Sequence, residues 1–360
     1  MRVLVVNAGS SSLKVDLVVD GTHRRSFDGL PLEPGDVDAV GHRVVHGGPN
    51  LIQPVVIDDG VEQQLRDLVE LAPLHQPKSL AGLDAARRLL PGVPHVACFD
   101  TAFHATLPAA AYTYALPAAW RNTWGVRRYG FHGLSHAWAS QRAQEMLSNA
   151  RQVVTCHLGA GASLAAVLDG ISVDTTMGFT PLDGLVMATR SGAVDPGLVT
   201  WLAEHEGLTA AQVAHALEHD SGLLGLGGTA DMRELLNRQD RHAQLAIEVY
   251  LHRLVGSIAS MTAALGGLDT LVFTGGVGEN AAEIRRRCTD KLAYLGVTIS
   301  QRLNRQGRPD IDLSEPGTAV RTLLVRARED LQIAAGTEQA LTTATTGSTT
   351  RAAAAPGTSR

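Results

Sequence analysis

Aromatic residues, basic charge and long apolar runs are all scarce in this 360-residue chain. Phe, Trp and Tyr make up 4% of the residues, which argues against the base-stacking surfaces of single-strand nucleic-acid binders. A formal net charge of −5 argues against a broad basic face for nucleic acid. No apolar run approaches the ~20 residues that span a bilayer, and the N-terminus lacks a signal-peptide pattern. We therefore expect no nucleic-acid and no membrane partner.

Cysteine is also scarce. Cys98, Cys156 and Cys288 are odd in number and widely spaced, so they predict neither a disulfide framework nor a zinc site. Buried thiols in a reducing cytoplasm are the expectation. With 44% hydrophobic and 19% charged residues, the composition is that of a soluble globular protein, and its length predicts two domains.

What the chain does have is a Gly/Ser-rich hairpin at its start. An apolar run at 3–6 predicts a buried strand, and the alternation from Leu13 to Val18 predicts a second. Between them lie Gly9 and three serines, followed by Lys14. Glycine admits a ligand close to the backbone, and hydroxyl, amide and lysine groups suit phosphate oxygens. The order is not that of a P-loop, and an ordinary Ser/Gly hairpin remains the alternative.

The same pattern returns about 150 residues later. Residues 153–170 again read as apolar strand, Gly/Ser tip, Ser-Leu, apolar strand and Asp-Gly, with Ser163-Leu164 in the place of Ser12-Leu13. An internal echo of this length predicts a duplicated domain, with a ligand held between two similar halves.

Other chemistry-bearing residues follow predicted strands or lie in glycine-rich loops. Arg43 ends a short apolar run before Gly47-Gly48, and its planar fork suits a carboxylate or phosphate, although a surface arginine is the common case. Asp100 follows a predicted strand at 93–99 and is either a ligand position or a helix N-cap. Residues 127–136 crowd two arginines and two histidines around a Gly-flanked Phe, and Arg190 lies in a long aperiodic loop typical of functional segments.

The remaining pattern predicts helices and connections. We expect a polar connection at 21–40, helices within 61–90 with Ser79 capping the second, and a loop at 108–126. Thr209 is expected to cap a helix to 219, and Asn280 to cap a helix after a Gly-rich turn, with Glu283 completing a capping box. A helix is expected at 240–265 and a last one from Glu329. The Thr/Ala/Ser repetition at 342–360 predicts a disordered tail.

Taken together, the blocks NAGSSSLK, GHRVVHGG, FDTAFH, RRYGFHGLSH, HLGAGAS, TMGFTPLDGL, TRSGAVDPG, SGLLG and FTGGVGEN resemble the acetokinase family, of the acetate and sugar kinase/Hsp70/actin superfamily. The resemblance runs from Met1 to about Gly336. It implies an α/β fold of two duplicated ribonuclease-H-like (actin-like ATPase) domains with an inter-domain cleft. The N-terminal domain would comprise 1–101 plus about 330–341, and the C-terminal one 102–329. It also implies a cytoplasmic homodimer.

The implied reaction is ATP + acetate ⇌ ADP + acetyl phosphate, with Mg²⁺ or Mn²⁺ as cofactor. By resemblance, the catalytic residues are Arg43, Asp100, His132 and Arg190, and the metal residues are Asn7 and Glu329. A small apolar pocket for the methyl group would be lined by Val45, Leu74, Phe131 and Pro181, beside Arg43. ATP would be bound by Ser10, Ser12, Lys14, His157, Leu158, Gly159, Ala160, Gly161, Asp231, Met232, Arg233, Gly276, Val277, Gly278, Glu279 and Asn280.

Three departures from the family pattern stand out. Ala160 occupies the position of a common Asn in HLGNGAS, Gln76 stands where Asn is expected, and the segment at 21–40 is short. The alternatives are a propionate or other short-chain acyl kinase, a catalytically impaired homologue, and a nucleotide-gated binding protein. One methylene in an apolar pocket is worth only ~1–3 kcal/mol, so the sequence does not separate acetate from propionate.

Overall fold

Both predicted hairpins form in the computed structural model, which describes residues 1–8, 13–30, 36–71 and 76–352. Strand β1 (Arg2–Ala8) pairs antiparallel with β2 (Leu13–Val19), and β7 (Gln152–Leu158) pairs antiparallel with β8 (Ala162–Leu168). The chain divides into two compact units, one of Met1–Phe103 with Arg328–Arg360 and one of His104–Ala327. We call them unit 1 and unit 2. The domain boundaries expected from the sequence stay a prediction.

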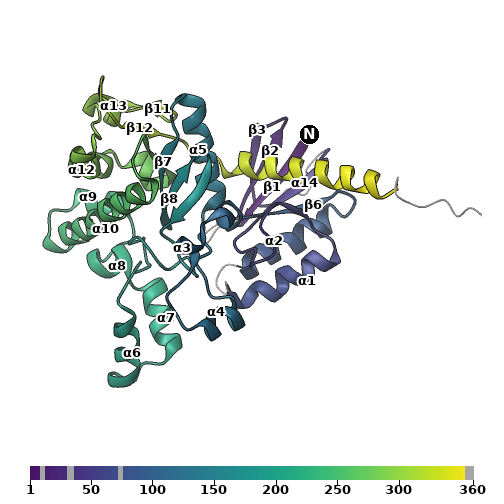
Figure 1. The fold of residues 1–360 in the computed structure, drawn as a ribbon, viewed down its shortest axis with the longest axis horizontal. Coiled ribbons are helices and arrows are strands. Elements are labelled where there is room, and N and C mark those ends of the chain that lie inside the picture. The colour runs from purple at the N-terminus through teal and green to yellow at the C-terminus, as the bar shows by residue number, and fades with distance from the viewer. Residues whose placement is uncertain (9–12, 31–35, 72–75, 353–360) are drawn as a thin grey trace, which may run out of the picture. The chain divides into compact units, whose positions relative to one another are not determined.

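Unit 1 is a mixed sheet with helices on both faces (Figure 1). Besides β1 and β2 it contains β3 (Thr22–Asp28), β4 (Ala39–Val44), β5 (Val55–Val56), β6 (His95–Phe99), α1 (Asp59–Asp67), η1 (Leu68–Leu71), α2 (Gln76–Leu89) and α14 (Glu329–Ala352). The strand order is β3-β2-β1-β4-β6-β5, with β1, β4 and β6 parallel. Leu4, Val6, Val40 and Ala86 form a buried cluster between the sheet and α2, and α14 covers the other face. The carboxyl ends of β1, β4 and β6 therefore meet at one edge.

At Gly41 in β4, side chains of α14 lie directly against the sheet backbone. A Cβ at this glycine would lie 2.4 Å from Thr337 Oγ1 and 2.8 Å from Ile333 Cγ2. We expect Gly41→Ala to lower the free energy of unfolding by ~1–3 kcal/mol, because α14 must move off the sheet. Gly256→Ala, inside a helix with open space around the glycine, is the control and should raise that free energy by ~0.5–1 kcal/mol. Urea unfolding of both variants measures the difference, and equal effects would contradict the close packing.

Unit 2 contains a second mixed sheet and most of the helices. Its elements are α3 (Ala109–Tyr112), α4 (Ala118–Trp124), α5 (Gly133–Met146), β7, β8, β9 (Ile171–Thr175), α6 (Pro196–His205), α7 (Ala210–His219), α8 (Gly222–Gly227), α9 (Met232–Asn237), α10 (Arg241–Leu265), β10 (Thr270–Thr274), α11 (Gly275–Asn280), α12 (Ala282–Lys291), η3 (Ala293–Leu295), α13 (Gln301–Gln306), β11 (Ile311–Asp312) and β12 (Arg321–Leu324). A short helix, η2 (Ala102–Thr106), spans the point where unit 1 gives way to unit 2. Helix α5 packs on β7 and β10, and α10 packs on β7, β8 and β9.

The two sheets confirm the predicted duplication. The order β9-β8-β7-β10-β12-β11 repeats the order of unit 1 strand for strand, including which neighbours are parallel. Both outer hairpins turn at an Asp-Gly pair with positive φ at both residues, Asp20-Gly21 and Asp169-Gly170. This conformation matches the twist of tight two-residue hairpins. An α/β fold of two duplicated units was therefore correctly predicted, whereas the inter-domain cleft stays a prediction.

Several local predictions are wrong. The connection expected at 21–40 contains β3, whose polar sequence is that of an exposed edge strand, and β3 pairs with β2 at the edge of the described sheet. The loop expected at 108–126 contains α3 and α4. Ser79 does not cap a helix, because α2 already begins at Gln76. Asn280 is the last residue of α11, where its side chain donates to the Gly276 carbonyl, and α12 begins without a side-chain cap.

Other expectations hold. Thr209 caps α7 in a full capping box, α10 fills the expected 240–265 segment, and all three cysteines are free and buried. Helix α14 continues to Ala352, past the residue where the tail was expected to begin. Among the described helices, none has the length and apolar character that crossing a membrane requires.

Candidate active site

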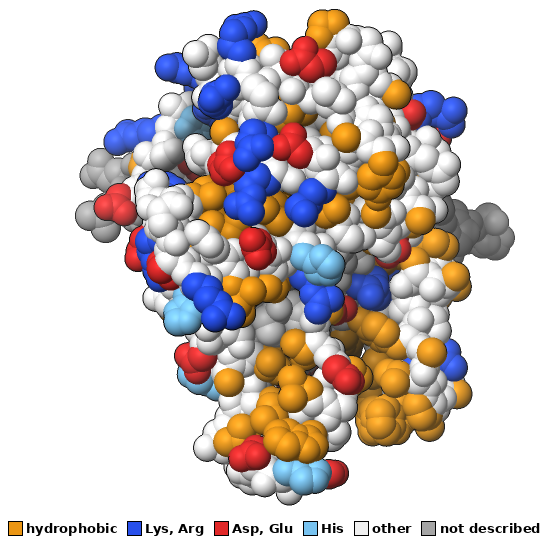
Figure 2. All heavy atoms as spheres, turned by 90° about the vertical axis from the view of Figure 1, so that its left-hand side faces the viewer, with side chains coloured by type: hydrophobic (Ala, Val, Ile, Leu, Met, Phe, Trp, Pro, Cys, Tyr) orange, Lys and Arg blue, Asp and Glu red, His pale blue; other side chains and the backbone are white. Residues whose placement is uncertain are grey.

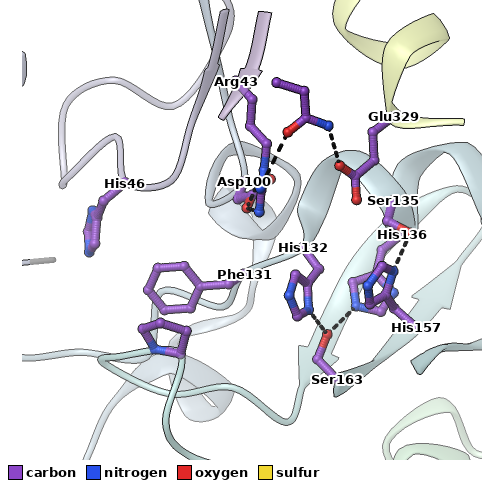
Figure 3. A network of polar contacts seen from close by, with 12 residues as sticks. Arg43, His46, Asp100, Phe131, His132, Ser135, His136, His157, Ser163 and Glu329 are labelled. Atoms are coloured by element: carbon purple, nitrogen blue, oxygen red, sulfur yellow. Dashed lines mark hydrogen bonds and ion pairs between the residues drawn. The ribbon is translucent and has the colours of Figure 1, made fainter. Parts of the chain in front are cut away.

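The strand-end edge of unit 1 gathers four of the predicted residues. Asn7 lies near the end of β1, Arg43 near the end of β4, and Asp100 directly after β6, while Glu329 opens α14. Arg43 Nε lies 3.2 and 3.1 Å from the two Asp100 carboxylate oxygens, and its Nη2 lies 2.5 Å from Oδ2 (Figure 3). Asn7 Nδ2 donates to Glu329 Oε2 at 2.8 Å across 322 positions of sequence.

The Arg43–Asp100 pair is nearly buried, with side-chain exposures of 12% and 2%. Burial alone would disfavour the charged guanidinium, but Asp100 and Glu329 outweigh it, and the pKa of Arg43 is raised. Arg43 therefore stays charged, and Asp100 restricts the direction in which its fork points. The Asp100 side chain thus binds an arginine, a role that differs from the ligand position and the helix N-cap that its place in the sequence left open.

A hard cation would find oxygen ligands at Asn7 and Glu329. Mg²⁺ usually takes one or two protein oxygens and completes its shell with water and substrate phosphates. The carboxylate of Glu329 fits such a partial shell. The Nδ2 of Asn7 donates to Glu329, while its amide oxygen lies 3.5 Å from Arg43 Nη1, so as placed here Asn7 presents its oxygen to the guanidinium rather than to a cation beside Glu329. No cluster of three or more His, Cys, Asp or Glu side chains suited to a metal occurs among the described residues. The described residues therefore do not indicate a metal site whose ligands all come from the protein.

Unit 2 brings together Arg190, His132 and the tip of the β7–β8 hairpin. A Cβ at Gly161 would lie 3.1 Å from His132 Cε1 and Nε2, and 3.6 Å from Arg190 Nη1. A side chain at this position would press on the His132 ring. The Arg190 loop is tied to the hairpin tip by a hydrogen bond from Ala188 N to Ala160 O, 3.1 Å long.

The Arg190 guanidinium is oriented on two sides. Its Nε lies 3.3 Å from Glu218 Oε2, with both side chains about 12% exposed, and its Nη1 donates to the Pro181 carbonyl at 3.2 Å. Glu218 comes from α7, and sequence analysis missed it, because nothing in the helical pattern of 209–219 distinguishes a partner of a distant loop from a surface carboxylate. In each unit, a candidate site arginine is thus oriented by a mostly buried carboxylate: Arg43 by Asp100 and Arg190 by Glu218.

His132 is held in an unusual backbone conformation. It has φ of 56° and ψ of 24°, in the left-handed region, immediately before α5. Its ring stacks on that of His157, with centroids 4.4 Å apart and an interplanar angle of 28°. His157 Nδ1 in turn lies 2.7 Å from Ser135 Oγ. A strained residue held by its surroundings is typical of functional sites.

The predicted ATP residues fall into separate segments. Residues 157–161 form the end of β7 and the hairpin tip, and residues 276–280 form α11 after β10; a Cβ at Gly159 would lie 4.0 Å from Gly276 N, so these two segments are neighbours. Residues 231–233 begin α9, where Asp231 caps the helix and binds the exposed Arg233. Glu279 accepts a hydrogen bond from Ala327 N. Binding of ATP by these segments stays a prediction.

Several predicted residues are not placed at a site. Ser10, Ser12 and Leu74 lie outside the described residues. Lys14 is exposed on β2, opposite Asn7 in the strand register. Val45 is buried in unit 1, and Phe131 and Pro181 are buried in unit 2, so the methyl pocket stays a prediction.

Comparison with known proteins gives consistent results. The model of the acetokinase family matches residues 28–335. The acetate kinase of Methanosarcina acetivorans is 40% identical over 395 residues, covering 94% of this chain and 97% of the relative, and that of Deinococcus deserti is 47% identical, covering 90% and 85%. Among solved structures, Porphyromonas gingivalis acetate kinase has a TM-score of 0.87 at 35% identity, covering 94% of this chain and 99% of that one. A propionate kinase from Francisella tularensis has the same TM-score and coverages at 34% identity.

Proposed function

The chain belongs to the acetokinase family, and from that premise we propose that it transfers a phosphoryl group reversibly between ATP and acetate, giving acetyl phosphate and ADP. The observation that carries the proposal is the pair of arginines, Arg43 and Arg190, each oriented by a carboxylate. Acetate attacking a phosphoryl group is an anion attacking an anion. Two forks held in fixed directions counter that repulsion and position both reactants.

The residues divide the chemistry among them. Acetate is already deprotonated, so no general base is needed. Arg43 and Arg190 clamp the carboxylate and the transferring phosphoryl group, Asp100 orients Arg43, and His132 donates a hydrogen bond to the phosphoryl oxygens as charge spreads over them. Asn7 and Glu329 would hold Mg²⁺, directly or through water. When bound, the cation neutralises phosphate charge.

The test is ATP-dependent acyl phosphate formation, trapped with hydroxylamine, on formate, acetate, propionate and butyrate side by side. We expect the highest kcat/KM with acetate. An optimum at propionate would keep the mechanism and change the substrate. No product from any acid, with ATP binding intact, would overturn the kinase proposal and favour an impaired homologue or a nucleotide-gated binding protein.

We include a homodimer in the proposal. Three tryptophans support it, because Trp120 and Trp124 on α4 and Trp201 on α6 are about half exposed. On the face of the molecule that Figure 2 shows, apolar side chains gather in the lower part. Exposed aromatic patches are typical of surfaces that bury against another protein. Light scattering on the purified chain measures the mass, and a monomer at micromolar concentration would contradict this part.

A substitution at Ala160 tests whether the β7–β8 hairpin tip binds the phosphates of ATP. Its side chain is exposed at the hairpin tip, so a larger residue fits there without a clash. We expect Ala160→Asn to lower KM for ATP about fivefold, because an amide adds one hydrogen bond worth ~1 kcal/mol. Ala160→Asp has the same shape and should raise KM, because its charge repels phosphate. Steady-state kinetics compares the two, and equal KM values would place the phosphates elsewhere.

A further inference from the structure

Four polar side chains of unit 2 form a hydrogen-bonded line that ends at His132. Thr155 Oγ1 on β7 lies 2.7 Å from His136 Nδ1. His136 Nε2 lies 2.7 Å from Ser163 Oγ on β8, and Ser163 Oγ lies 2.9 Å from His132 Nδ1 (Figure 3). Thr155, His136 and Ser163 are completely buried. The motif around 127–136 drew attention to both histidines, but only the fold connects them through hydroxyls of two strands.

The Thr155 hydroxyl determines which groups donate and which accept along this line. The other acceptor near the Thr155 hydroxyl is the Ala165 carbonyl at 3.5 Å, which is beyond the 2.5–3.0 Å range of O–H···O bonds. Thr155 therefore donates to His136 Nδ1. A neutral imidazole carries one proton, so His136 is protonated at Nε2 and donates to Ser163. The single hydroxyl proton of Ser163 is then directed to His132 Nδ1.

His136 is suited to hold this direction. Burial, together with the neighbouring His104 and His157, lowers its pKa well below the usual 6.5, so its ring stays neutral. His104 also has a lowered pKa, about 4, because it is buried. The Nε2–H of His104 donates a hydrogen bond to the Phe131 carbonyl, 3.1 Å away. No charge from these two rings disturbs the line.

We propose that Thr155, His136 and Ser163 are positioning residues that select the tautomer of His132, leaving Nδ1 as acceptor and the proton on Nε2. That edge of the ring faces Gly161, where a Cβ would lie 3.1 Å from Nε2, beside Arg190. This inference rests on the proposed function. The line would give His132 an N–H donor in a fixed direction for the phosphoryl group, without requiring a charged imidazolium. The hydrogen-bond donor is thus built into the ground state.

The direct test is the ring nitrogen spectrum of His132. Two-bond ¹H–¹⁵N spectra of the full chain with ¹⁵N-labelled histidine separate protonated from unprotonated ring nitrogens, and His132→Gln identifies the His132 signals by their loss. We expect Nε2 protonated and Nδ1 unprotonated at neutral pH. A proton on Nδ1 in the wild-type chain would overturn the proposal, and this measurement needs no variant of the line itself.

Variants test which residues impose the tautomer. Thr155→Val keeps the shape and removes the first donor, so His136 can carry its proton on either nitrogen and His132 should populate both tautomers. Thr155→Ser keeps the hydroxyl and should retain the wild-type tautomer. Ser163→Ala removes the last link and should give both tautomers as well. An unchanged His132 spectrum in Thr155→Val and Ser163→Ala would overturn the proposal.

Kinetics separates this inference from the function on which it rests. Ser163→Ala should lower kcat for acyl phosphate formation about tenfold with KM for ATP unchanged, because the donor acts on the transferring group. If the wild-type chain forms no acyl phosphate, the proposed function fails, while the spectra still decide whether the line sets the tautomer. If kcat falls but His132 keeps its tautomer, Ser163 acts in another way and the inference fails alone.

Discussion

Arg190→Ala is expected to lower kcat for acetyl phosphate formation by about 10³-fold or more, while ATP still binds. Arginines that stabilise the charge of a transferring phosphoryl group are worth roughly 10³–10⁵ in rate. The guanidinium is held by Glu218 and the Pro181 carbonyl, so its fork is directed before substrate arrives. Hydroxylamine trapping measures the rate, and equilibrium dialysis with ATP measures binding.

Two further variants sharpen this result. Arg190→Lys keeps the charge and loses the planar fork, so an intermediate rate is expected. Arg151→Ala removes an arginine that is 70% exposed and paired with Asp169 on the surface of the same unit, and it should leave kcat unchanged. A chain that retains wild-type turnover without Arg190 would not be a kinase of the proposed type, whereas loss of ATP binding would point to damage beyond the clamp.

The Arg43–Asp100 pair is expected to affect both stability and turnover, in a way that two variants can separate. Asp100→Leu leaves a charged Arg43 buried without its carboxylate and should lower the free energy of unfolding by ~3–5 kcal/mol. Replacing both residues, Arg43→Met with Asp100→Leu, removes the uncompensated charge and should recover most of that loss. Turnover should remain abolished in both, because the clamp is missing.

Urea unfolding and hydroxylamine trapping on the same samples provide the two readouts. Asp84→Leu is the matched control, since Asp84 pairs with Arg66 in the same unit but both side chains are more than a third exposed. An exposed pair is worth ~0–1 kcal/mol, so this variant should be nearly as stable as the wild type and fully active. Recovery of turnover in the double variant would show that Arg43 does not take part in the reaction.

Local chemistry made much of the fold predictable. Apolar strand patterns on both sides of a Gly/Ser tip are typical of a β-hairpin, so both hairpins and their repetition could be predicted from the sequence. Thr209 with Gln212 three residues later specified a helix start by itself. Where packing sets the boundary, prediction failed: α2 begins at the buried Gln76, and β3 is a strand because β2 offers it an edge.

The site divides in the same way. Arg43, Asp100, His132 and Arg190 could be named from motifs because each motif is contiguous in the chain. The contacts of these side chains could not be predicted from motifs. Asn7 forms a hydrogen bond with Glu329 across 322 positions, and Arg190 forms an ion pair with Glu218, which lies on a helix whose sequence shows no distinguishing pattern.

The sequence by itself therefore determined the duplicated hairpins, the long helix α10 and the identity of the candidate residues, because these depend on neighbours a few positions apart. Only the tertiary structure decided which carboxylate orients which arginine, and which hydroxyls reach the His132 ring. The physical reason is that parallel strands bring their carboxyl ends to one edge from distant parts of the chain. Pairing at that edge depends on register and packing, which no local pattern encodes.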